Sequence, residues 1–88
     1  MVKAKIEKIL LEKFNPQYLQ VIDDSHKHAG HAGARDPASG GAGGGHYRVI
    51  IVASIFEGKK LIDRHRMIYE ALKPVKDSIH ALAIQALY

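Results

Sequence analysis

The sequence predicts an α+β sandwich, in which one three-stranded mixed sheet carries two helices on one face. Apolar residues recur with helical spacing over residues 3–14 and again from Leu61 to Leu72. Residues 46–54 form a β-branched, apolar segment typical of a central strand. The 24 residues between Ser54 and Ile79 suit a helical crossover that joins two parallel strands.

The first predicted helix covers residues 3–14. Its apolar stripe consists of Ile6, Ile9, Leu10 and Phe14. Asn15-Pro16 ends this helix, because proline lacks an amide donor and forces the preceding residue toward extended geometry. Residues 18–22 then predict a short strand.

A glycine-rich segment follows, which contains seven of the eight glycines between Gly30 and Gly45. It has too few apolar side chains to offset the entropy lost on ordering, so we expect a flexible loop at about residues 25–45. Because closure entropy grows only with the logarithm of loop length, this loop can still join two antiparallel strands.

After the central strand, residues 56–58 predict a turn, and the second helix runs from there to near Pro74. Its apolar stripe consists of Leu61, His65, Ile68 and Leu72, with Ile62 and Tyr69 beside it. Residues 79–84 predict the last strand, although the alanines within it leave a helix as the alternative. The order is therefore helix, strand, strand, helix, strand, with one sheet face or edge left to a partner.

Composition narrows the possible functions. The 88 residues are enough for one small domain, 1–88, and the net charge of +4 suits either nucleic acid or an acidic protein partner. With no cysteine, the chain has no disulfide and no thiol nucleophile, so any metal ligands must be histidine or carboxylate. The longest apolar run, Val49 to Ala53, is too short to span a bilayer. We expect a cytoplasmic protein with no membrane segment.

Two catalytic interpretations fail on sequence context. The glycine tract precedes a strand and lacks the lysine and hydroxyl residue of a phosphate-binding loop. Asp23, Asp24, Ser25 and His26 are adjacent in the chain, whereas a catalytic triad requires convergence in space and an oxyanion site. We therefore expect a protein that is not an enzyme.

Several segments together resemble the BolA-like family. They are VIDDSHKH at 21–28, HYRV at 46–49, FEG at 56–58, RHRMIY at 64–69 and IHALA at 79–83. The resemblance implies a fold similar to class II KH domains and a partnership with a monothiol glutaredoxin in handling a 2Fe-2S cluster. The glycine-rich insert, the lack of a loop cysteine and the lack of an acidic-aromatic tail depart from the pattern of some relatives.

By this resemblance, His28 in the loop and His80 at the start of the last strand are metal ligands. The cluster's other ligands would be thiolates of glutaredoxin and glutathione, so we expect no cluster in the isolated chain. His26 and His31 are alternative ligands if the insert shifts the loop. We expect His65 to be a core or boundary residue, and it is a further alternative ligand. We expect His46 to pack or to form hydrogen bonds.

Lys59, Lys60, Arg64 and Arg66 form a basic cluster around the start of the second helix. Such a cluster can be a solvent-exposed surface without a partner, or it can bind an acidic surface of glutaredoxin or DNA. A small DNA-binding regulator is thus the alternative function, although Gly58-Lys59-Lys60-Leu61 lacks the second glycine of a KH turn. For the free chain we expect a monomer or a weak homodimer.

Overall fold

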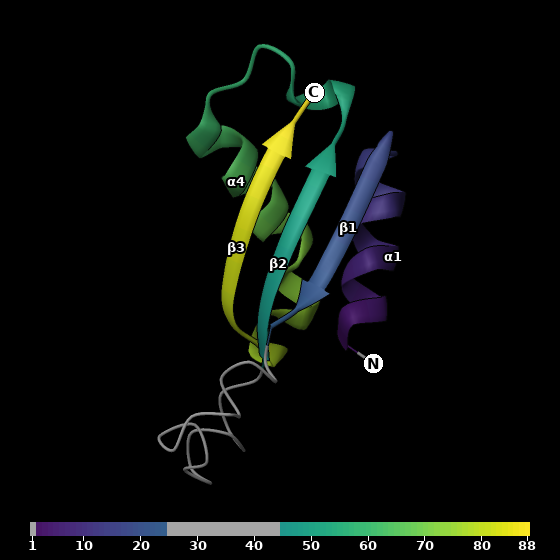
Figure 1. The fold of residues 1–88 in the computed structure, drawn as a ribbon. Helices are drawn as coiled ribbons and strands as arrows, with labels where there is room; N and C mark the ends of the chain where they lie inside the picture. The colour runs from purple at the N-terminus through teal and green to yellow at the C-terminus, as the bar shows by residue number, and fades with distance from the viewer. Residues whose placement is uncertain (1, 25–44) are drawn as a thin grey trace, which may run out of the picture.

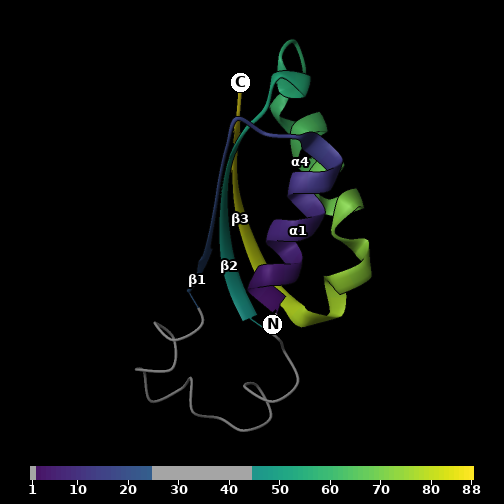
Figure 2. The ribbon, with the colours of Figure 1, turned by 90° about the vertical axis from the view of Figure 1, so that its right-hand side faces the viewer.

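The computed structural model describes residues 2–24 and 45–88, which form one three-stranded sheet with two α-helices on the same face (Figures 1 and 2). The elements, in chain order, are α1 (Val2–Phe14), β1 (Tyr18–Asp23), β2 (Gly45–Val52), the short 3-10 helix η2 (Ser54–Phe56), α4 (Leu61–Ala71), the 3-10 helix η3 (Lys73–Ser78) and β3 (Ile79–Leu87). The predicted α-β-β-α-β order and fold class are confirmed. The flexible loop predicted at 25–45 lies, except for Gly45, outside the described residues.

The sheet has the order β1-β2-β3, so β2 is central. β1 pairs with β2 antiparallel and β3 pairs with β2 parallel, as the crossover length predicted. Two parallel strands start at the same end of a sheet, so the first residues of β2 and β3 lie together.

The ends of α1 and of the turn before α4 follow from local chemistry. Asn15 has a φ of 47°, in the left-handed region that commonly ends a helix, and its N–H donates to the carbonyl of Leu11 at 3.1 Å. Gly58 has a φ of 78°, which glycine adopts without steric cost. Both chain reversals fall where the sequence predicted them.

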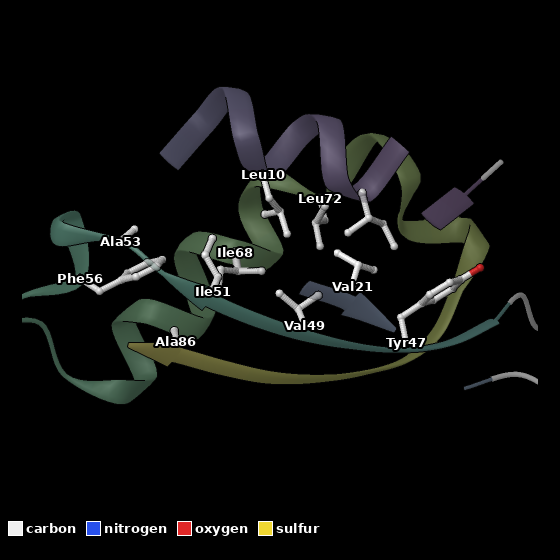
Figure 3. Close-up of a cluster of buried hydrophobic side chains, with 11 residues drawn as sticks. Leu10, Val21, Tyr47, Val49, Ile51, Ala53, Phe56, Ile68, Leu72 and Ala86 are labelled. Atoms are coloured by element: carbon white, nitrogen blue, oxygen red, sulfur yellow. The ribbon is translucent and has the colours of Figure 1, made fainter. Parts of the chain in front are cut away.

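The core lies between the helices and the sheet (Figure 3). Alternate residues of β2, among them Val49 and Ile51, are fully buried against the helices, together with Leu10 of α1 and Ile68 of α4. Phe56 of η2 is also fully buried, and its ring centroid lies 5.3 Å from that of Phe14. No helix of the described residues lies on the opposite face of the sheet (Figure 2).

Three details differ from the sequence predictions. β2 ends at Val52 because Ser54 already begins η2, and β3 continues to Leu87 rather than ending at 84. The alternative of a last helix is wrong. Ile68 of α4 and Leu72, which follows the helix directly, are buried as expected, but Leu61 is 63% exposed because the helix meets the core only along its second half. Among residues 2–24 and 45–88, no helix combines the length and the apolar character needed to cross a bilayer.

Candidate functional site

Two histidines lie together at a point where the pairing of β2 with β3 is irregular. Gly45 pairs with Ile79, but His46 pairs with Ala81, so His80 is an extra residue in β3. Without this β-bulge, Ala81 and Ala83 would face the helices. With it, Leu82, Ile84 and Ala86 face the core instead, which is the arrangement that the apolar pattern of β3 requires.

His80 lies beside His46, at the end of the sheet where β2 and β3 begin. Their ring centroids are 5.0 Å apart, with an interplanar angle of 49°. Tyr47 points toward the helices (Figure 3), so His46, its neighbour in the strand, lies on the open face. His46 is half-buried and His80 is exposed. We call these two residues the histidine pair.

The spacing of the histidine pair suits two ligands of one metal. Metal–nitrogen bonds to histidine are about 2 Å long, which places two ring centroids about 5 Å apart at a near-tetrahedral angle. Within the part of the chain that the structure describes, no three His, Cys, Asp or Glu residues gather as a possible metal site. The histidine pair is therefore a partial ligand set, which other groups must complete.

Beside the histidine pair lies a shallow hollow of about 220 Å³. It is lined by Asp24, His46, Tyr47, Ala81, Leu82 and Ala83. The small side chains of Ala81 and Ala83 leave the open face shallow next to His46. The Arg48 guanidinium forms an ion pair with the Asp24 carboxylate at 3.3 Å. In the described part of the chain, two small side chains therefore border His46 on this face.

Tyr47 is a core residue rather than a ligand. Burial raises the pKa of its phenol above the usual value of 10.0, and the negative charge of Asp23 raises the pKa further. The phenol therefore stays neutral over the physiological pH range. The Tyr47 side chain is directed toward the helices (Figure 3).

The other histidines named from the sequence do not join this pair in the described structure. His28, His26 and His31 lie outside the described residues, so their roles remain predictions. His65 is half-buried on α4, in the helical layer on the other face of the sheet (Figure 2). The structure thus brings His80 together with His46, which the sequence analysis had assigned to packing or hydrogen bonding.

A signal for His46 was present in the sequence. His46 and His80 each stand near the start of a strand, and the two strands were predicted to be parallel and adjacent. Parallel neighbours begin at the same end of a sheet, so the two imidazoles were bound to lie near each other. What the sequence did not reveal was the bulge, which makes His80 an extra residue of β3.

The predicted basic cluster is divided by the structure. Lys59, Lys60 and Arg66 border an open hollow of about 610 Å³ at the start of α4, together with Asp63 and Glu70. The Arg66 guanidinium lies 3.7 Å from the Asp63 carboxylate, and both side chains are well exposed. These three cations are accessible to a charged partner.

Arg64 is instead held within the fold. Its Nε donates to the carbonyl of Lys59 at 2.8 Å, and its Nη1 donates to the carbonyl of Ala86 at 2.9 Å. Its guanidinium also lies 5.0 Å from the ring centroid of Tyr88, within cation–π range. Arg64 therefore connects α4 to the end of β3.

Comparison with known proteins gives consistent matches. A family model described as "BolA-like protein" matches residues 10–88. The chain is 47% identical over 81 residues to an uncharacterized protein in the cobS 5' region of Sinorhizobium sp., covering 91% of this chain and 83% of that protein. It is 34% identical over 85 residues to the DNA-binding transcriptional regulator BolA of Escherichia coli, covering 96% and 72%.

Among solved structures, the BolA domain of SufE1 from Arabidopsis thaliana superposes with a TM-score of 0.76 at 34% identity, covering 98% of this chain and 90% of that one. The chain corresponds to 22% of the length of the whole SufE-like protein 1, to which it is 43% identical. The likeness is thus to one domain of that longer protein.

Proposed function

Because this chain belongs to the BolA-like family, we propose that it is a non-enzymatic partner of a monothiol glutaredoxin and that the two share a 2Fe-2S cluster. The shared cluster serves cluster transfer or assembly, or the sensing of iron. His80 supplies one ligand, and a second histidine, His46 or the loop residue His28, supplies another.

The histidine pair is the observation that carries this proposal. Two imidazoles 5.0 Å apart have the spacing of ligands on one iron. Imidazoles replace two thiolates on one iron of Rieske centres and raise the reduction potential of the cluster. A chain without cysteine is therefore chemically competent to hold one side of a 2Fe-2S cluster.

The proposal also accounts for the incompleteness of the site. A 2Fe-2S cluster requires four terminal ligands, and the described residues offer two neighbouring imidazoles. The remaining ligands are the thiolates of the glutaredoxin cysteine and of glutathione, which reach the histidine pair over the open face of the sheet. The small side chains of Ala81 and Ala83 leave room for this approach.

A titration of the chain into cluster-loaded glutaredoxin tests the proposal. We expect visible absorption and circular dichroism spectra that differ from the sum of the components. His80→Ala should abolish the difference, whereas His65→Ala, a matched loss of one imidazole on the helical layer, should leave it intact. Additive spectra with the wild-type chain would contradict the proposal.

The identity of the second ligand is decided in the same assay. If His46 is the ligand, His46→Ala changes the spectrum and His28→Ala does not. If the loop residue is the ligand, the reverse holds. The geometry of the histidine pair favours His46.

A second candidate function is DNA binding, which the name of the Escherichia coli relative states for that protein. The supporting observation is the exposed group of Lys59, Lys60 and Arg66 at the start of α4. Replacing all three by glutamine should weaken DNA binding and reduce the salt dependence of the affinity, by about one unit of log–log slope for each lost phosphate contact. Unchanged DNA affinity in this triple variant would show that this group of cations does not bind DNA.

A further inference from the structure

β3 is an outer strand with an unusually neutral edge. Its nine residues, Ile79–Leu87, contain no lysine, arginine, aspartate or glutamate. Among residues 2–24 and 45–88, β3 pairs with β2 on one side, and no strand pairs with its other side. Long, uncharged edge strands are templates for pairing with another chain, and natural proteins usually protect them.

The backbone direction shows which groups lie on that edge. In a parallel ladder the N–H and C=O of one residue point to one side of the strand, and those of the next residue point to the other. The carbonyl of Leu87 accepts from the N–H of Ala53, on the β2 side. The carbonyls of Leu82, Ile84 and Ala86 therefore point away from β2, toward the free edge.

Two side chains of α4 cover this edge. The Tyr69 hydroxyl donates to the carbonyl of Leu82 at 3.3 Å, and Arg64 Nη1 donates to the carbonyl of Ala86 at 2.9 Å. The carbonyl of Lys59 and the ring of Tyr88 hold the Arg64 guanidinium in place. Two of the three outward carbonyls are thus already occupied from within the chain.

We propose that the free edge of β3 is a latent interface for β3 of a second copy of this chain, and that Arg64 and Tyr69 keep it closed. Antiparallel pairing of two β3 strands about a two-fold axis would place each strand against itself. Because β3 carries no fixed charge, this pairing brings no like charges together. The result is a continuous sheet built from the three strands of each copy.

The opposite edge fits this occupant less well. β1 has six residues against the nine of β3, and it includes the charged residue Asp23. This interface involves α4 and the free edge of β3, and it does not depend on cluster binding by the histidine pair.

The test uses the full chain carrying Arg64→Met and Tyr69→Phe, which remove both donors and keep most of the side-chain bulk. In sedimentation velocity across a concentration series, we expect this double variant to dimerise with a dissociation constant at least about tenfold below that of the wild-type chain. Arg66→Met is the matched control, because it removes the same charge from an exposed side chain of α4 and should not change association. A folded double variant that associates no more strongly than the control would overturn the proposal.

A third substitution locates the interface. Ala83 is exposed at the middle of β3, and Ala83→Lys would place like charges opposite each other in a symmetric pair. Added to the double variant, it should restore the monomer, and a dimer of unchanged strength would refute the assignment to β3. If the double variant does not fold, Tyr69→Phe alone, which removes one hydroxyl, decides the question: association above the wild-type level supports the proposal, and its absence overturns it.

Discussion

Arg64→Met should destabilise the fold by about 2 to 3 kcal/mol, because Arg64 makes three contacts that methionine cannot replace. The hydrogen bonds to the carbonyls of Lys59 and Ala86 contribute roughly 1 kcal/mol each. The contact with the Tyr88 ring adds about 0.5 kcal/mol. For a domain of this size, such a loss lowers the melting temperature by about 10 to 20 °C.

Urea unfolding followed by circular dichroism measures this difference, with Arg66→Met as the control. Arg66 carries the same charge, but its ion pair with Asp63 is exposed, so its loss should cost less than about 0.5 kcal/mol. If the two variants lose equal stability, Arg64 is an ordinary surface cation that does not stabilise the contact between α4 and β3.

Three further predictions concern the core, the pH dependence and the site. Phe56→Ala should cost about 3 to 5 kcal/mol, because it empties a fully buried position against Phe14, and urea unfolding should show most of the stability lost. Because the pKa of Tyr47 is raised in the folded chain, the unfolded chain loses the phenol proton at a lower pH than the folded chain does. The stability that Tyr47 contributes is therefore present below pH 10 and is lost as the pH rises above 10. Comparing the unfolding free energies of the wild-type and Tyr47→Phe chains at pH 8 and 11 checks this, and an equal decline in both would contradict it. Ala81→Leu should fill the hollow beside the histidine pair, with little effect on stability because Ala81 is exposed. It should weaken cluster sharing in the glutaredoxin titration. Full cluster sharing by this variant would show that the cluster does not use the hollow.

The features that depend on local chemistry were predictable from the sequence. The stripe of α1, its end at Asn15 and the turn at Gly58 each follow from a few neighbouring residues, and the structure confirms them. The parallel pairing of β2 with β3 also followed, because the length of the connection restricts it.

The features that depend on distant packing were less accessible. Leu61 has the right spacing for the core, but only the position of α4 against the sheet decides that it stays exposed. The length of β3 was underestimated because its alanines have low strand propensity, whereas pairing with β2 extends the strand to Leu87.

The candidate site was predicted in part. His80 was identified through a family resemblance, and its place at the start of β3 is confirmed. His46 was assigned to packing or hydrogen bonding, although its place near the start of a strand parallel to β3 already put it near His80. The bulge itself has a physical cause, since it keeps the larger apolar residues of β3 in the core.

Pulsed electron paramagnetic resonance of the reduced cluster shared with glutaredoxin, prepared with ¹⁵N-histidine in this chain alone, tests the central proposal most directly. We expect strong hyperfine coupling from two histidine nitrogens, reduced to at most one in the His80→Ala chain. A cluster in the wild-type complex without any coupling to labelled histidine would show that this chain supplies no ligand.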